Sequence, residues 1–538
     1  MIDTVKMFLF CFKSLRKQKI YTFLFYILTI VCGGISLLVP MINSKVIDCI
    51  SFGNERNLLL TIKYFFSINL LFALFSFIKN KIYIIVQTNS TYNIIENLLK
   101  HLQKISISHI EQQDLGSLNE KINNDSNTVT SFIIKTVGDV IINFATLLFS
   151  IYILIELNGA LGILMLFIGF IYCLIYLLLR KNIYKLSFKL LEEQATFFSA
   201  MLMQLNHIKF IKIHSLIDEY QKKMSSSYQK YYESVIKSQN FFYLYSSLDA
   251  IITIFANTFV FIVGGNLVIT KEITIGEFTI ILSYFNYIIS SFKYFSSLAK
   301  EYQETKVSYT RLIDLFNIEE EEDGSKELSN VNSISCVNVS IKRNGRLLFS
   351  NFNYNFLPGS IYCICGENGK GKTSLIDTII GIHNNEYNGK ILFNNIPIHQ
   401  INMYQLRYEC ISYMDQVPFL IEGNLRDNIL LTQNHSFKNI EDPLTINISE
   451  INNFNDSIKL INSDGSGISG GEAQKLALYR MFAKKADVYI LDEPTASLDQ
   501  NSINKFMNYL NKVKKDKIII IISHNLTTIQ MCDYVIDL

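Results

Sequence analysis

The chain has 538 residues, more than a single domain of about 150 residues requires. Hydrophobic residues make up 49% and charged residues only 18%, well below the roughly 25% that is usual in a soluble domain. The formal net charge of +2 argues against a strongly basic nucleic-acid-binding protein, so no nucleic-acid partner is expected.

Six apolar stretches in the first part of the chain are long enough to cross a lipid bilayer as helices, which takes about 20 residues each. They are Ile20–Ile42, Leu60–Ile78, Phe132–Leu157, Ala160–Leu179, Phe242–Ile269 and Ile275–Leu298. Basic residues between Lys6 and Lys19 precede the first stretch and place the N-terminus on the cytoplasmic side. The sequence therefore predicts a multi-pass protein of the cytoplasmic (inner) membrane.

The segments between stretches two and three and between stretches four and five are long, polar and rich in lysine. We expect them to continue the membrane helices into the cytoplasm, with breaks near Gly116 and around Asn206–His214. Such breaks put short transverse pieces at the cytoplasmic ends, where they can touch a second domain.

Charged residues within the apolar stretches normally face a cavity or a partner. Asp249 and Lys293 lie at similar depth and are a candidate ion pair, either self-neutralising or used for substrate or gating. The aromatic residues of the last stretch, including Tyr284 and Phe285, are expected to pack against neighbours or lipid rather than to form a substrate wall.

Residues 319–330 contain an acidic run with glycine and serine, typical of a solvated linker. The sequence thus predicts a transmembrane domain at 1–318, a linker at 319–330 and a second domain at 331–538. The expected fold class is an α-helical membrane domain of six helices followed by an α/β P-loop ATPase domain.

The second domain contains a phosphate-binding loop between a short apolar strand, Ile361–Cys365, and a helix. Glycines allow the loop to curl so that its N–H groups point at phosphate oxygens, and the helix N-terminus adds positive charge. Lys372 is expected to reach the β- and γ-phosphates of ATP, and the Thr373 hydroxyl to ligate Mg²⁺. The predicted ATP-binding residues here are Gly366, Glu367, Asn368, Gly369, Lys370, Gly371, Lys372, Thr373 and Ser374.

A second apolar strand, Val488–Asp492, ends in two carboxylates. Asp492 is expected to hold Mg²⁺, and Glu493 is expected to polarise the water that attacks ATP. The combination with the phosphate loop predicts ATP hydrolysis.

The segment from Ile468 to Glu472, Ile-Ser-Gly-Gly-Glu, resembles the signature of ABC transporter ATPase domains. Further positions match motifs of that family in order, and the resemblance assigns their roles. Gln416 resembles the loop glutamine that senses Mg²⁺ and contacts the membrane domain, and His524 resembles the switch histidine at the γ-phosphate. Asp499 resembles the family's D-loop aspartate.

The membrane half is similar to the six-helix exporter type of this family. The resemblance implies a domain-swapped dimer in which Ser469, Gly470 and Gly471 of one chain complete the ATP site of the other. The presence of both Glu493 and His524 favours a homodimer over a heterodimer with one inactive site. The partner implied is thus a second half-transporter chain.

Two positions depart from the family pattern. The signature usually ends in glutamine, and here Glu472 brings a carboxylate near the triphosphate. Arg343 stands where the family usually stacks an aromatic ring on adenine, and a guanidinium stacks with less area.

The resemblance leaves the exported substrate open. A peptide of the bacteriocin type is the leading hypothesis, and lipid or drug export is the next. An ATP-gated channel or regulator is a third reading, which the intact catalytic residues disfavour. An importer is the least favoured, because importers usually carry the two parts on separate chains.

Overall fold

The computed structural model describes residues 2–538 except 112, 114, 158, 322–323, 344–345, 383–386, 432–469 and 497. It forms two compact units, Met1–Lys104 with Glu111–Glu319, and Ile105–Ile110 with Glu320–Leu538. The division after Glu319 falls at the start of the predicted linker. Ile105–Ile110, which the sequence assigns to the first domain, groups with the second unit, where Ile105 forms an isolated β-bridge with Glu320.

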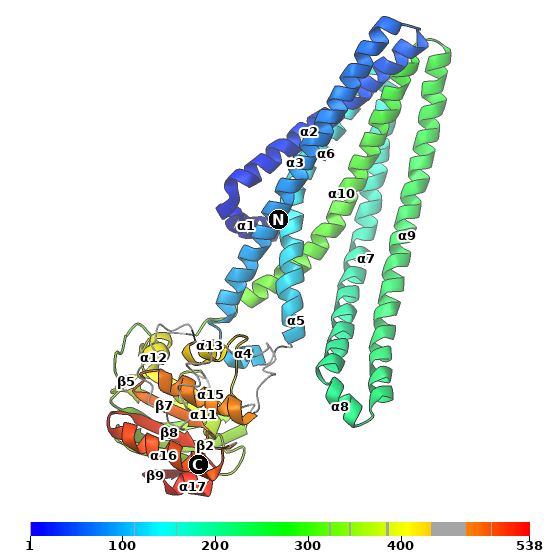
Figure 1. Cartoon of the computed structure of the whole chain (residues 1–538). Coiled ribbons are helices and arrows are strands. Elements are labelled where there is room, and N and C mark those ends of the chain that lie inside the picture. Colours follow the sequence, from blue (N-terminus) through cyan, green and yellow to red (C-terminus); the bar gives the residue numbers. More distant parts are fainter. Residues whose placement is uncertain are drawn as a thin grey trace. The chain divides into compact units, whose positions relative to one another are not determined.

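Long helices make up the first unit, as its apolar and lysine-rich helical stretches predict (Figure 1). In chain order they are α1 (Ile2–Leu15), η1 (Arg16–Gln18), α2 (Lys19–Ser51), α3 (Glu55–Leu102), α5 (Leu115–Glu120), a π-helical turn η2 (Lys121–Asp125), α6 (Ser126–Leu157), α7 (Gly159–Asn206), α8 (Ile208–Ile213), α9 (Ile217–Ile269) and α10 (Ile275–Phe316). Helices α7 and α9 run side by side and are joined through α8.

Five helices in the described part of the chain are long and apolar enough to cross a membrane. They are Lys19–Ser51, Glu55–Leu102, Lys121–Leu157, Ile217–Ile269 and Ile275–Phe295. The sixth predicted span, Ala160–Leu179, lies inside α7, which is helical throughout Gly159–Asn206. Helices α3, α7 and α9 continue well beyond their apolar stretches, as predicted.

Both predicted helix breaks are present. Helix α7 ends at Asn206 and α9 begins at Ile217, with the short α8 between them, as the sequence indicates. The break predicted near Gly116 lies between α4 (Ile107–Glu111) and α5, which begins at Leu115. The chain also leaves the helix earlier, at Gln103–Ser106, between α3 and α4.

Tyrosines of α10 donate hydrogen bonds to backbone carbonyls of α2 near Pro40. Pro40 lies inside α2 and has no N–H, so the carbonyl of Ser36 one turn earlier lacks its helical donor. The Tyr287 hydroxyl donates to that carbonyl at 3.2 Å, and the Tyr284 hydroxyl donates to the Leu37 carbonyl at 2.8 Å. The Tyr284 side chain is fully buried, which confirms that it packs rather than facing lipid.

The same two helices are joined again where α2 approaches its end and α10 begins. The Asp48 carboxylate accepts hydrogen bonds from the Gly276 N–H at 2.8 Å and the Thr274 hydroxyl at 3.0 Å. Thr274 and Glu277 form a capping box on the same helix. A Cβ at position 276 would lie 2.4 Å from the carboxylate, so only glycine fits there.

The second unit is an α/β domain with two sheets and the short helix α4 (Ile107–Glu111). Its elements are β1 (Ile334–Arg343), β2 (Arg346–Phe356), β3 (Ser360–Cys365), α11 (Lys372–Ile379), β4 (Tyr387–Phe393), β5 (Ile396–Pro397), η3 (Ile398–Gln400), α12 (Met403–Glu409), β6 (Ile411–Met414), α13 (Leu425–Leu430), α15 (Gly470–Ala483), β7 (Val488–Asp492), α16 (Gln500–Val513), η5 (Lys514–Asp516), β8 (Ile518–Ile522), α17 (Leu526–Gln530) and β9 (Tyr534–Asp537).

The larger sheet of this unit is parallel, with strand order β6-β7-β8-β3-β9. Its central strands β7 and β8 are buried along their whole length, as continuous apolar runs predict. The smaller sheet, β2-β1-β4-β5, is antiparallel.

Candidate functional site

The residues predicted to bind and hydrolyse ATP follow neighbouring strands of the parallel sheet. Ile364 of β3 lies opposite Ile522 of β8, and Ile522 lies opposite Asp492 of β7, so these strands end together. The phosphate loop follows β3, Glu493 follows β7 and His524 follows β8. Because parallel strands share one carboxyl edge, residues far apart in sequence meet there, where ligands bind in open α/β sheets.

The phosphate loop has the backbone that its glycines predict. Gly366, Gly369 and Gly371 have φ values of 137°, 81° and 96°, which favour glycine. Lys372 begins α11, is 8% exposed, and donates to the carbonyls of Gly366 and Glu367 at 2.9 and 3.0 Å. The ammonium is therefore held over the loop, where it can pair with phosphate oxygens. Ser374 is buried, whereas Glu367, Asn368, Gly369 and Lys370 are exposed.

The two predicted magnesium ligands are in direct contact. The Thr373 hydroxyl donates to Asp492 Oδ2 at 2.8 Å, although the residues are 119 positions apart. A hydroxyl beside a carboxylate is the hard oxygen set that Mg²⁺ prefers, so these residues fit the ion. Burial raises the pKa of Asp492, the Thr373 hydrogen bond opposes that shift, and the neighbouring Glu493 carboxylate adds to it.

Glu493 is held in an uncommon backbone conformation. Its φ is 48°, in the left-handed region, and its N–H donates to the Ile522 carbonyl at 2.9 Å. The side-chain amide of Gln474, only 2% exposed, donates to the Glu493 carbonyl at 3.0 Å. The Glu493 Oε1 lies 3.8 Å from His524 Nε2, so the structure brings the two predicted catalytic side chains together.

The described part of the signature lies at the start of α15. Gly470 is its exposed first residue and Glu472 is exposed in the first turn, whereas Ser469 lies outside the described residues. Asp499 caps α16 by accepting from the Ser502 N–H at 3.4 Å. Hydrogen bonding by Ser502 lowers the pKa of the Asp499 carboxyl.

The remaining predicted residues lie at the margins of the site. Gln416 is exposed two residues after β6 ends. Arg343 ends β1 opposite Arg346, which begins β2. A Cβ added to Gly371 would come 3.0 Å from Leu348 of β2, so the hairpin that carries Arg343 lies against the phosphate loop.

Arg480 of α15 connects that helix to the segment after β6 through hydrogen bonds. Its guanidinium donates to the carbonyls of Phe419 and Asn428, both at 2.7 Å, and to Asn428 Oδ1 at 3.2 Å. Asn428 is fully buried and exchanges hydrogen bonds with the N–H and carbonyl of Ile421, each at 2.8 Å. The helix that follows the signature is thereby fixed to the chain that follows Gln416.

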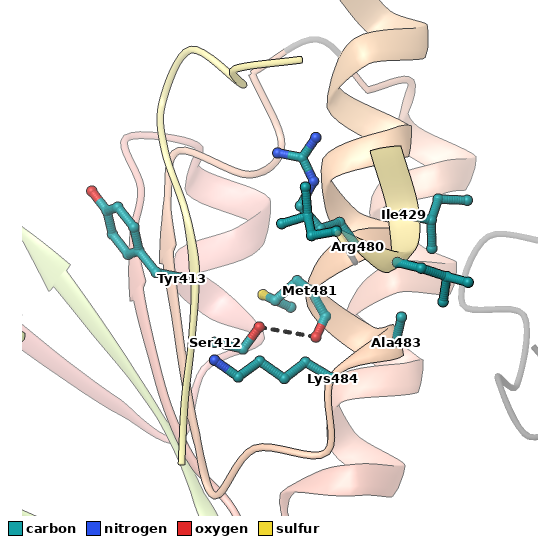
Figure 2. A pocket seen from close by; sticks show the side chains of 9 residues that line it. Ser412, Tyr413, Ile429, Arg480, Met481, Ala483 and Lys484 are labelled. Atoms are coloured by element: carbon teal, nitrogen blue, oxygen red, sulfur yellow. Dashed lines mark hydrogen bonds between the residues drawn. The ribbon is translucent and has the colours of Figure 1, made fainter. Parts of the chain in front are cut away.

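Beside Arg480 lies a small pocket of about 130 Å³ between β6, α13 and α15. In its wall the Ser412 hydroxyl of β6 donates to the Met481 carbonyl of α15 at 3.0 Å (Figure 2). Lys484, also lining the pocket, donates to the carbonyls of Arg407 and Ile411. These hydrogen bonds occupy the Ser412 hydroxyl and the Lys484 ammonium. The pocket is therefore part of the structural contact between helix and sheet.

Gln474 and Arg480 were not predicted from the sequence. Each is a polar residue on a helix, and the sequence alone does not tell a buried polar residue from one that faces solvent. Their spacing of six residues places them on different sides of α15, so no periodic pattern groups them.

Comparison with known proteins agrees with both units. The family model described as "ABC transporter transmembrane region" matches residues 22–292, and the model described as "ABC transporter" matches residues 349–496. A solved bacterial Atm1-family ABC exporter with ATP bound has the same fold, with a TM-score of 0.85 at 16% identity, covering 97% of this chain and 94% of that one.

Curated relatives include several bacterial transporters. The lactococcin-A transport/processing ATP-binding protein of Lactococcus lactis is 24% identical over 82% of this chain, and ComA of Streptococcus pneumoniae is 24% identical over 86%. The chain spans only 62% and 65% of the length of these two relatives. The ATP-dependent lipid A-core flippase of Haemophilus influenzae is 22% identical over 94% of this chain and 86% of its own length.

Proposed function

The chain belongs to the ABC transporter family, and from that premise we propose that it hydrolyses ATP to export a peptide across the cytoplasmic membrane. One observation carries the proposal. Thr373, Asp492 and Glu493 converge at one edge of a parallel sheet, in a chain that also has helices of membrane-spanning length.

Each residue of the site has a separate role in ATP hydrolysis. Lys372 pairs with the β- and γ-phosphates, and Glu493 orients the attacking water and accepts its proton. Thr373 and Asp492 would hold Mg²⁺, which when bound neutralises phosphate charge. His524, 3.8 Å from Glu493, lies where it can contact the γ-phosphate as the proton moves.

The dimer is part of the same proposal. Gly470 and Gly471 open α15 at an exposed helix start, which suits the capture of a nucleotide held by a second chain. A homodimer is favoured because both Glu493 and His524 are present in this chain. The ATPase unit would lie in the cytoplasm, where ATP is available.

Peptide is the proposed cargo because two relatives carry transport/processing names, one of them for lactococcin A. Lipid export is the second candidate, since the lipid A-core flippase matches a larger share of both chains. A peptide requires hydrogen-bonding groups on the membrane helices, whereas the acyl chains of a lipid require apolar surface.

The test is ATP hydrolysis by the full chain in lipid nanodiscs, measured with panels of peptides, drugs and lipids. The comparison is wild type against Glu493→Gln, with the exposed Glu327→Gln as the matched control. We expect hydrolysis to fall at least about 100-fold in Glu493→Gln and to rise with peptides in the wild type. Unchanged hydrolysis in Glu493→Gln would refute the assigned chemistry, and stimulation by lipids alone would refute the peptide assignment.

A further inference from the structure

The outward surface of α10 is polar within its membrane-length segment. From Gly276 to Phe295 the exposed residues are Asn286, Ser290 and Lys293, and every other residue there is buried or half-buried. Their spacing of four and then three residues puts all three on one face of the helix. The opposite face, with Tyr284 and Phe285, is buried in the helix bundle.

The neighbouring helix α9 shows the contrasting pattern. Its exposed residues at comparable positions include Ile254 at 63%, Phe255 at 73% and Ile262 at 66% exposure. Such a surface suits lipid hydrocarbon. A lysine that faces lipid at the same depth costs several kcal/mol, so the polar face of α10 is better matched to water, a polar ligand or a polar partner than to hydrocarbon.

An ion pair marks the inner part of this face. Lys293 Nζ lies 2.9 Å from Asp249 Oδ2 on α9, which confirms the pairing that their depth predicts. The Lys293 side chain is 43% exposed and that of Asp249 is 17% exposed. Lys293 is therefore the more exposed partner of the pair, and its ammonium has three N–H donors, more than one carboxylate oxygen uses.

We propose that Asn286, Ser290 and Lys293 line the transport path and bind the exported peptide, with Lys293 binding a peptide carboxylate. The Asn286 amide both donates and accepts, which matches the N–H and carbonyl groups of a peptide backbone. An acyl chain offers these side chains no partner. The inference rests on the proposed peptide export, because the ligand chemistry follows from that cargo.

The first experiment tests the path without any substrate. Single cysteines replace Asn286, Ser290 and Lys293, with Ile254→Cys and Phe255→Cys as lipid-facing controls, in the full chain in nanodiscs. A charged, membrane-impermeant methanethiosulfonate reagent should label the α10 cysteines at least about tenfold faster than the α9 controls, after subtraction of labelling in the unsubstituted chain. Equal labelling rates at the α10 and α9 cysteines would overturn the assignment.

The second experiment tests the charge preference. Two synthetic peptides that differ only in Asp or Asn at one position are compared as stimulators of ATP hydrolysis, with phosphatidylglycerol as a third probe. In the wild type we expect half-stimulation at about tenfold lower concentration for the acidic peptide. The preference should vanish in Lys293→Met and persist in Lys293→Arg.

The outcomes separate the two levels of the proposal. Equal preference for the acidic peptide in wild type and Lys293→Met would overturn the role of Lys293 while leaving peptide export standing. Stimulation by phosphatidylglycerol and by neither peptide would overturn peptide export itself, and the peptide contact would fall with it. The cysteine labelling is read independently in either case.

Discussion

Replacing Gln474 with methionine tests whether the backbone of Glu493 must be held in place for hydrolysis. The substitution removes the 3.0 Å hydrogen bond to the Glu493 carbonyl and leaves that acceptor only the longer 3.3 Å bond from the Ala496 N–H. The loss of such a bond costs about 0.5–1.5 kcal/mol. Left-handed φ at a non-glycine residue costs about 1–2 kcal/mol, a similar amount, so Glu493 is expected to relax and move its carboxylate.

We expect kcat for ATP hydrolysis to fall about 2- to 13-fold, the equivalent of about 0.5–1.5 kcal/mol. The KM for ATP should stay within about twofold, because the hydrogen bond that is removed holds the Glu493 carbonyl and not a residue of the phosphate loop. The assay is phosphate release against ATP concentration, with Lys475→Met on the same helix as the control. Adding Gln474→Met to Glu493→Gln should slow hydrolysis no further, since Gln474 acts through Glu493.

A wild-type kcat in Gln474→Met would refute this reasoning directly. An equal loss in the two Met variants would do so as well, because it would indicate damage to α15 rather than misplacement of Glu493.

Three further predictions concern the same unit. Glu472→Gln should raise kcat or lower KM for ATP by removing a carboxylate from near the triphosphate, and identical kinetics in both variants would dismiss that repulsion. Arg480→Leu should lower the free energy of unfolding of the ATPase unit by about 3–5 kcal/mol by leaving buried carbonyls unpaired, measured by urea denaturation, whereas Arg480→Lys should lose less. Burial raises the pKa of Asp492, so protons compete with Mg²⁺ at higher pH than at an ordinary aspartate, and Mg²⁺ affinity should fall as pH drops through that raised pKa. In Asp492→Asn this pH dependence of Mg²⁺ affinity should disappear, and its persistence would assign it to another group.

The sequence places the residues of the predicted ATP site because their motifs are local and lie at the ends of strands. The sequence pattern alone identifies the strand that ends in Asp492 and the loop that leads into α11. The parallel sheet then brings Thr373 and Asp492 together. Depth counting along apolar stretches was enough to pair Asp249 with Lys293, because both positions lie a few residues from the cytoplasmic end of their stretch.

Other features depend on packing that no short segment encodes. The contact of Gln474 with Glu493 needs the relative position of α15 and β7, and helix periodicity alone does not supply it. The additional helix break at Gln103–Ser106 was not predicted, because no glycine or proline marks it in the sequence. The part of the signature before Gly470 lies outside the described residues, so Ser469 stays a prediction.

The hydrogen bonds from α10 to α2 have a consequence for how the membrane unit is assembled during synthesis. Until α10 is synthesised, the Ser36 carbonyl, one turn before Pro40, lacks its donor, and an unsatisfied carbonyl in hydrocarbon costs several kcal/mol. Its donor, Tyr287, is synthesised 251 residues later. The first membrane helix is therefore inserted incomplete, and the last one completes it, so truncation before α10 should leave α2 exposed to quality-control proteases even though every residue of α2 is present.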